Sequence, residues 1–195
     1  KVDFFKNNGY LPNNKIINQE QLDQLRVSLE DIVHGRNPFK EELISGSTIE
    51  PEKGFAYFQG AWYIDKFFHD LIFQPSITVP ITQLLGTTKV RFWHDQIFYK
   101  PAKIGTGVSW HQDYSYWQRS RPSNHITLWM GLDDATAENG CLEVIPGSHK
   151  WGLLPTVGLV SNELDNLKQH LTPEQIEQFK PTKIEMKAGF GSFHH

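Results

Sequence analysis

The second half of the chain consists of short apolar runs separated by turn-forming residues, and this alternation restricts the possible folds more than any other feature. The runs from Val90 to Tyr99, from Ile126 to Leu132 and from Leu142 to Ile145 are rich in β-branched and aromatic residues. Clusters of Gly, Pro, Asn and Ser lie between them. Short strands separated in this way are typical of an antiparallel sandwich or a jelly roll. The sequence therefore predicts a β-core over residues 87–195.

The first half is predicted to carry helices, mainly within residues 18–86. Asn18 followed by Gln21 is the pattern of a capping box, and apolar residues then recur at helical spacing as far as Gly35. Two more helical segments are expected, at 64–73 and 76–85. A chain of 195 residues is long enough for one domain with a sizeable core, and its sequence contains no internal repeat. We therefore expect a single domain, residues 1–195, of the mainly β (α+β) class, with the helices packed on one sheet.

A segment from residue 153 to about residue 180 interrupts the β-rich pattern. It contains Thr172, Pro173 and Gln175, which are a helix cap, a proline suited to the first helical position and a capping-box glutamine. This combination predicts a short helix. We expect residues 153–180 to be a lid-like insertion in the β-core.

Composition and charge argue against several classes of protein. The formal net charge is -3 and the pI is about 6.3, so no basic surface is expected to attract nucleic acid or an anionic membrane. We also expect no membrane helix and no signal peptide, because neither pattern occurs in the sequence. Cys141 is the only cysteine, which excludes a disulfide within the chain and suits a reducing compartment. The prediction is a cytoplasmic protein that acts on a small molecule; its oligomeric state is not predicted.

The stretch from Trp110 to Trp117 (WHQDYSYW) carries the strongest chemical signal. In an extended strand, side chains two residues apart point to the same face, so His111 and Asp113 would lie side by side. An imidazole and a carboxylate can supply two of the three ligands of a facial His-carboxylate-His iron site. The aromatic residues around them suit the wall of a dry pocket. A single H-x-D pattern also occurs by chance, so the rest of the sequence has to support the assignment.

A second group of polar residues lies on the expected strand at 90–99. By alternation, one face of this strand carries Phe92, His94, Gln96, Phe98 and Lys100. Buried polar groups need partners, and a small anionic ligand would provide them. The alternative is a solvated sheet face. The residues alone leave both possibilities open.

Four motifs in fixed order give the chain its resemblance to a known family. They are Gln96–Pro101 (QIFYKP), the WHQD at 110–113, Glu138–Leu142 (ENGCL) and Pro146–His149 (PGSH). Together they resemble the phytanoyl-CoA dioxygenase family of iron(II)- and 2-oxoglutarate-dependent oxygenases, and the resemblance extends from the first residues to His195. It implies a double-stranded β-helix, a cupin-like jelly roll, with helices packed outside. It also implies Fe(II) as metal and 2-oxoglutarate as co-substrate.

The resemblance assigns roles to particular residues. His111 and Asp113 match the first two iron ligands. The candidate contacts to 2-oxoglutarate are Trp129, Gln96, Lys100 and His94. The candidates for the substrate side, with packing of the lid as the alternative reading, are Tyr114, Tyr116, Trp117 and Arg119. The insertion at 153–180 would cover the mouth of the site and move.

The chain departs from the family pattern at its C-terminal end. In the family, the second histidine ligand lies a few residues beyond the first His of a segment like Phe193–His195, and an arginine that binds 2-oxoglutarate follows. We expect both positions after residue 195. His194 or His195 as a substitute ligand is the less favoured reading.

The expected activity is hydroxylation of a C–H bond in a small organic substrate. Dioxygen would be consumed, and 2-oxoglutarate would be decarboxylated to succinate and CO2. Two alternatives remain open: a jelly-roll protein that binds a small ligand without catalysis, and a metal-dependent isomerase or hydrolase on the same barrel. The sequence does not predict which substrate is used.

Overall fold

The fold is described from a computed structural model of the chain. The structure describes residues 1–44, 47–50, 55–103, 107–117, 124–159 and 164–195. The chain divides into two compact units: unit 1 contains residues 1–14 and 107–195, and unit 2 contains residues 15–106. Each unit is described by itself. The single domain expected over the whole chain stays a prediction.

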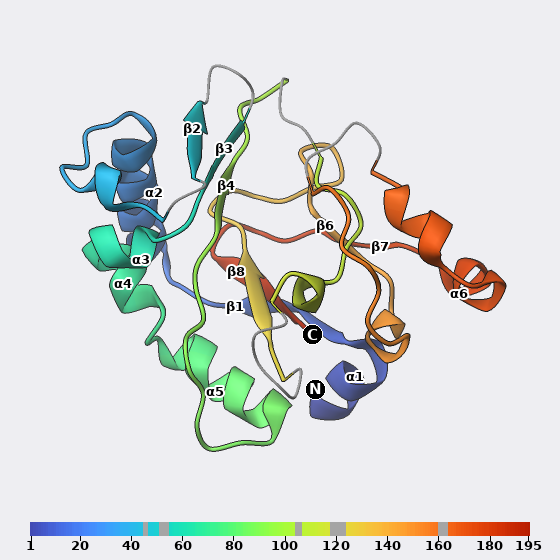
Figure 1. Cartoon of the computed structure of the whole chain (residues 1–195). Helices are drawn as coiled ribbons and strands as arrows, with labels where there is room; N and C mark the ends of the chain where they lie inside the picture. Colours follow the sequence, from blue (N-terminus) through green and yellow to red (C-terminus); the bar gives the residue numbers. More distant parts are fainter. Residues whose placement is uncertain (45–46, 51–54, 104–106, 118–123, 160–163) are drawn as a thin grey trace. The chain divides into compact units, whose positions relative to one another are not determined.

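Unit 1 is built around a three-stranded sheet in the order β1-β8-β5 (Figure 1). Its strands are β1 (Tyr10–Lys15), β8 (Phe190–His194) and β5 (Thr127–Met130). β5 and β8 are antiparallel, and their register pairs Thr127 with His194 and Trp129 with Ser192. Because directly opposed residues share a face of the sheet, these four side chains lie on one side. This face carries most of the candidate site.

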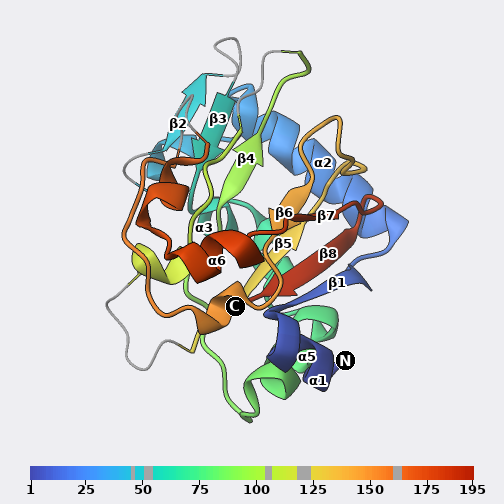
Figure 2. The same cartoon turned by 90° about the vertical axis from the view of Figure 1, so that its right-hand side faces the viewer.

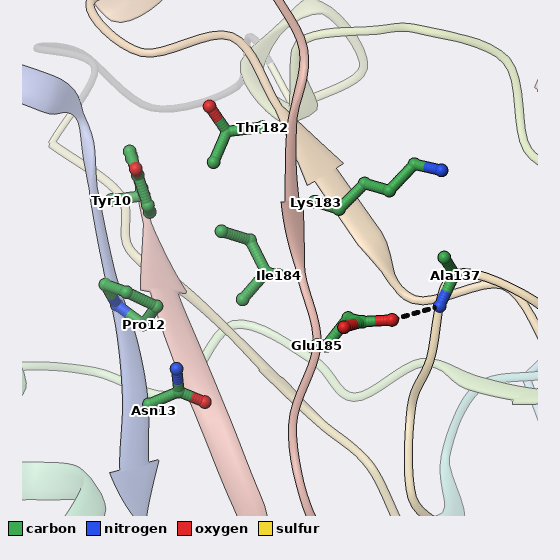
Figure 3. A pocket seen from close by; sticks show the side chains of 8 residues that line it. All are labelled: Tyr10, Pro12, Asn13, Ala137, Thr182, Lys183, Ile184 and Glu185. Carbon is green, nitrogen blue, oxygen red and sulfur yellow. Dashed lines mark hydrogen bonds between the residues drawn. The ribbon is translucent and has the colours of Figure 1, made fainter.

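A two-stranded antiparallel sheet and two short helices complete unit 1 (Figure 2). The strands are β6 (Leu142–Val144) and β7 (Thr182–Ile184), and the helices are α1 (Val2–Asn8) and α6 (Pro173–Gln178). An apolar cluster joins the two sheets, with Tyr10, Ile184 and Met186 buried at its centre and Trp129 and Phe190 packed against it. A surface hollow of about 430 Å³ lies beside this cluster, between β1 and β7 (Figure 3).

Unit 2 contains the longer helices. They are α2 (Gln19–Val33), α3 (Ala61–Ile64), α4 (Lys66–Leu71) and α5 (Pro75–Leu85). The predicted capping box of α2 is present: the Asn18 side chain accepts the backbone N–H of Gln21, and the Gln21 side chain accepts that of Asn18. α5 continues through Pro80 and ends at Gly86. The helices expected at 18–35, 64–73 and 76–85 are therefore confirmed, with a break between α3 and α4.

The strands of unit 2 form an antiparallel sheet in the order β2-β3-β4. They are β2 (Thr48–Glu50), β3 (Phe55–Phe58) and β4 (Ile97–Tyr99). The strand expected at 90–99 is thus much shorter than predicted, because only its last residues pair with β3. The preceding Phe92 and Trp93 are 43% and 47% exposed. A high β-propensity does not make a strand where no neighbouring strand supplies the hydrogen bonds.

The observed class is mixed helix and strand with antiparallel sheets. The predicted mainly β composition is not confirmed, because helices hold more of the described residues than strands do. None of the helices in the described ranges is both long and apolar enough to span a bilayer.

Candidate metal centre

His111 and Asp113 lie together in unit 1. His111 Nε2 is 3.1 Å from Asp113 Oδ1, so the side-by-side arrangement expected for these residues is present. The expected strand is not: Gln112 has extended backbone angles, and a short 3-10 helix begins at Asp113. The single extended residue is enough to put its two neighbours on the same side.

The partners of His111 fix the orientation of its ring. Nδ1 lies 2.7 Å from the carbonyl oxygen of Ser109, to which it donates. This leaves Nε2 as the atom that faces Asp113. Burial acts to lower the pKa of His111, but its hydrogen bond to Asp113 and the attraction of that charge outweigh burial and raise the pKa above its ordinary value. A metal-bound histidine is commonly held in this way, with its second ring nitrogen donating to a backbone carbonyl.

Asp113 is held by groups on β5 and β8. Its Oδ2 accepts the hydroxyl of Thr127 at 2.5 Å and lies 3.3 Å from Nε2 of His194. The side chain of Asp113 is only 17% exposed. Burial acts to raise its pKa, but the hydrogen bonds from His111 and His194 dominate and hold the pKa well below its usual range. The carboxylate is therefore ionised and is surrounded by groups that carry or donate protons.

Two further polar atoms on the same face have no partner. Ser192 Oγ and His194 Nδ1 are buried and make no hydrogen bond to the described residues. Ser192 and His194 are two apart on β8 and so point to the same side as Thr127 and Trp129. Because buried polar atoms are nearly always hydrogen-bonded, this face is suited to a polar ligand or to ordered water.

His111 Nε2 and Asp113 Oδ1 are two of the donors that a facial-triad iron site requires, one imidazole and one carboxylate. Ligand atoms about 2.1 Å from an octahedral ion and at right angles to each other lie about 3 Å apart, close to the 3.1 Å between these two atoms. In the described part of the chain, no three His, Cys, Asp or Glu side chains form a ready-made metal site. His111 lies at Oδ1 of Asp113, whereas His194 lies at Oδ2. The candidate metal-binding atoms are therefore His111 Nε2 and Asp113 Oδ1.

The predicted substrate-side residues contact different neighbours. The rings of Tyr114 and Trp117 lie 5.5 and 6.1 Å from the ring of His125. The ring of Tyr116 packs edge-on against His111 at 6.0 Å. The Tyr116 hydroxyl donates to the carbonyl of Val157, which agrees with the alternative reading of packing against the insertion. Arg119 lies outside the described residues.

The predicted co-substrate contacts fall in both units. Trp129 lies in unit 1, on the face of Asp113's partners, and packs against the apolar cluster. The other three belong to unit 2. There, Gln96 donates to the hydroxyl of Tyr57, His94 lies beside Trp93, and burial lowers the pKa of Lys100. None of the four lines the hollow between β1 and β7, so that hollow is not the candidate site (Figure 3).

Two residues of the centre were missed or given less weight by the sequence reasoning. Thr127 was not singled out, and His194 was considered only as a substitute ligand. Their positions follow from the pairing of β5 with β8, and they lie 14 and 81 residues from Asp113 in the sequence. No local pattern marks them. The one available signal was the strand-like character of both segments.

Comparison with known proteins identifies the family. The family model for phytanoyl-CoA dioxygenase (PhyH) matches residues 5–195. L-proline trans-4-hydroxylase of Streptomyces griseoviridis is 27% identical over 179 residues, which cover 90% of this chain and 64% of that protein. Phytanoyl-CoA dioxygenase 1 of Oryza sativa subsp. japonica is 27% identical over 222 residues, which cover 97% of this chain and 77% of that protein. The chain therefore spans less than two thirds of the first of these relatives.

Solved structures show the same fold. The non-heme alpha ketoglutarate dependent carbocyclase SnoK from nogalamycin biosynthesis has a TM-score of 0.76 at 23% identity, with 100% of this chain and 72% of that chain covered. EctD from S. alaskensis, in its apoform, has a TM-score of 0.76 at 20% identity, with 99% and 66% covered. With the family model matching nearly every residue, the chain belongs to the phytanoyl-CoA dioxygenase family.

Proposed function

We propose that the chain forms the metal-binding part of an iron(II)- and 2-oxoglutarate-dependent dioxygenase that hydroxylates a C–H bond of a small organic substrate. The observation that carries this proposal is the buried, ionised Asp113 with His111 Nε2 beside one oxygen and Thr127 and His194 at the other. Family membership supports it. So do the names of related proteins, which include an L-proline trans-4-hydroxylase and an ectoine dioxygenase.

The proposed architecture is a double-stranded β-helix. In this proposal the β1-β8-β5 sheet and the β6-β7 sheet belong to the jelly roll. The fold shared with SnoK and EctD supports this arrangement. A barrel interior would place the face of β5 and β8 that carries Asp113's partners away from bulk water, where electrostatic interactions are stronger.

His111 Nε2 and Asp113 Oδ1 would hold the ferrous ion. A related structure, the epimerase SnoN, is described in complex with Fe3+ and alpha ketoglutarate, which supports iron as the metal. Bound iron would supply open positions for the keto acid and dioxygen and the oxidising power for C–H hydroxylation. We assign His194 to the outer oxygen of Asp113, as a hydrogen-bond partner, because the family pattern puts its second histidine ligand at another position in the sequence.

The chain's own groups would orient the ligands and exclude water. The Ser109 carbonyl holds the His111 ring, and the Thr127 hydroxyl fixes the outer oxygen of the carboxylate. Fixed ligands lower the cost of rearrangement when the ion binds. Trp129 would form an apolar wall beside the centre and limit the access of water.

The co-substrate assignments remain as predicted from the sequence: Trp129, Gln96, Lys100 and His94. A related EctD structure is described with 2-oxoglutarate and 5-hydroxyectoine, which supports 2-oxoglutarate as the co-substrate. Lys100 is half-buried, and a carboxylate of 2-oxoglutarate would offset the cost of burying its ammonium group. Tyr114, Trp117 and Arg119 stay candidates for the substrate side. For Tyr116 we prefer the alternative, packing against the insertion, because its hydroxyl donates to the Val157 carbonyl. A cytoplasmic location stays a prediction.

The test measures conversion of 2-oxoglutarate to succinate by a full-length chain, which includes the ligand positions expected after residue 195, in the presence of ferrous iron and dioxygen. Because the substrate is not identified, the readout is the slow conversion that occurs without substrate. We expect Asp113→Ala to abolish it, since a ligand and the charge that balances the ion are both lost. The exposed acid Asp3, on α1, provides the matched control, and Asp3→Ala should retain the activity of the unchanged chain.

Three outcomes would contradict the proposal. Equal conversion by Asp113→Ala and the unchanged chain would remove the metal assignment. Binding of 2-oxoglutarate without any succinate would favour a ligand-binding jelly roll. Turnover of a substrate with zinc and without dioxygen would favour an isomerase or hydrolase.

A further inference from the structure

A segment of residues 152–157, here called the strap, runs alongside the turn that carries His111 and Asp113. Side chains of the turn bind the backbone of the strap at several points. Gln112 Nε2 donates to the carbonyl of Gly152 at 3.0 Å, and Gln112 Oε1 accepts the N–H of Leu154 at 2.8 Å. One amide side chain thus binds the strap as donor and as acceptor.

Two more side chains of the turn continue this pattern. The hydroxyl of Ser115, which is buried, donates to the carbonyl of Leu154 at 3.0 Å. The hydroxyl of Tyr116 donates to the carbonyl of Val157 at 2.5 Å and accepts its N–H at 3.1 Å. The strap is therefore hydrogen-bonded at three of its residues to three side chains that follow His111.

Gln112 lies between the two candidate ligands in the sequence, so its hydrogen bonds to the strap affect the positions of both. Gln112 is extended, so its side chain points away from the side on which His111 and Asp113 meet. The strap consequently lies behind the ligand pair. Tyr116 acts on a ligand more directly, because its ring packs edge-on against the ring of His111 while its hydroxyl is tied to the strap.

We propose that Gln112 and Tyr116 are positioning residues of the metal centre, which fasten the strap to the ligand-bearing turn and so hold His111 and Asp113 in a geometry ready for the metal. This inference rests on the proposed function. It assigns the first part of the insertion a fixed, supporting role instead of that of a moving cover. Neither residue touches the metal or the substrate in this scheme.

The first measurement tests the fastening without any metal. Hydrogen–deuterium exchange of the metal-free chain reports on the amides of Leu154 and Val157, whose acceptors are the Gln112 and Tyr116 side chains. We expect Gln112→Ala to raise exchange across residues 152–157 about tenfold, since a lost pair of hydrogen bonds lowers the cost of local opening. Tyr116→Phe should raise exchange at Val157 while its ring still packs against His111.

The second measurement tests the effect on the ligands. The dissociation constant for cobalt(II), a spectroscopic stand-in for ferrous iron, is measured optically without 2-oxoglutarate. We expect about tenfold weaker binding in Gln112→Ala, the usual scale for loss of an outer partner of a metal ligand. Gln112→Glu keeps an acceptor for Leu154 and should fall between Gln112→Ala and the unchanged chain. Exposed Gln83 on α5 and exposed Tyr63 on α3 provide controls, and Gln83→Ala and Tyr63→Phe should match the unchanged chain in both measurements.

The outcomes separate this inference from the proposed function. If the strap loosens but cobalt binding and succinate formation keep their values, the positioning role is wrong and the proposed function stands. If amide exchange of the strap is unchanged in both Gln112→Ala and Tyr116→Phe, these side chains do not hold the strap in place. If the unchanged chain binds no cobalt and forms no succinate, the proposed function fails, whatever the exchange of the strap shows.

Discussion

Asp113 is the residue of the candidate metal centre that interacts with the side chains of His111, Thr127 and His194. Its burial would be costly for an ionised carboxylate without partners, since a charge taken out of water needs compensation. His111, Thr127 and His194 supply that compensation from three different parts of the chain. In the metal-free protein these groups stabilise the negative charge. A divalent ion at Oδ1 would take over much of that task from His111.

The role given to His194 leads to a prediction at this scale. If His194 only hydrogen-bonds the outer oxygen of Asp113, then His194→Gln should keep cobalt(II) affinity within about threefold of the unchanged chain, because the glutamine amide can still donate there. His194→Ala should weaken binding about 10- to 100-fold. An optical titration with cobalt(II) measures both, and exposed His170 provides His170→Ala as control. Equally severe loss in His194→Gln and His194→Ala would mean that His194 is itself a ligand.

At the scale of elements, the loop that contains Pro146–His149 has a clear structural task. It binds the C-terminal end of α1, where helix carbonyls lack partners within the helix. Gly147 N donates to the carbonyl of Asn8 at 2.8 Å, Lys150 Nζ donates to that of Asn7 at 3.0 Å, and His149 Nε2 lies 3.0 Å from that of Lys6. Basic side chains at this end of a helix also interact favourably with its dipole. The PGSH motif is thus explained by packing within unit 1.

Gly9, which caps α1, should be intolerant of a side chain. Its φ is +81°, and a Cβ there would lie 2.5 Å from Nδ1 of His149. Gly86, which caps α5, offers a matched control with φ +65° and nothing within 4 Å. We expect Gly86→Ala to lower the free energy of unfolding by about 1 kcal/mol, the strain of the left-handed conformation alone. Gly9→Ala should lose clearly more, because the clash is added, and chemical denaturation measures both. Equal losses would show that His149 moves aside freely.

At the scale of the whole molecule, the question is whether units 1 and 2 fold together. Each has its own fully buried aromatic residue: Phe193 in unit 1 and Phe58 in unit 2 are both 0% exposed. The sequence predicts one domain over residues 1–195, and a single domain typically unfolds in one cooperative transition.

Substitution of the two phenylalanines tests this prediction. Removing a buried Phe side chain costs about 3–5 kcal/mol. If the chain is one domain, Phe58→Ala and Phe193→Ala should each shift the same single transition in calorimetry and in chemical denaturation. Phe73→Ala, at a position 64% exposed, should leave the transition in place. Two transitions, each sensitive to only one of the substitutions, would show two domains.

The sequence by itself determined what depends on neighbouring residues. The capping boxes at Asn18 and Thr172 are present where predicted, because a cap requires only a side chain and an N–H three residues apart. The side-by-side placement of His111 and Asp113 was also predictable, since one extended residue between them suffices. The family motifs added the expected chemistry of that pair.

Only the tertiary structure decided which distant segments meet. β5 pairs with β8, and β6 with β7, so the consecutive strands β5 and β6 do not form a hairpin with each other. Strand pairing depends on register and on partners far along the chain, which local propensity does not encode. The same cause brought Thr127 and His194 to Asp113. It also brought the strap to Gln112, a residue whose sequence position gave no sign of what its amide would bind.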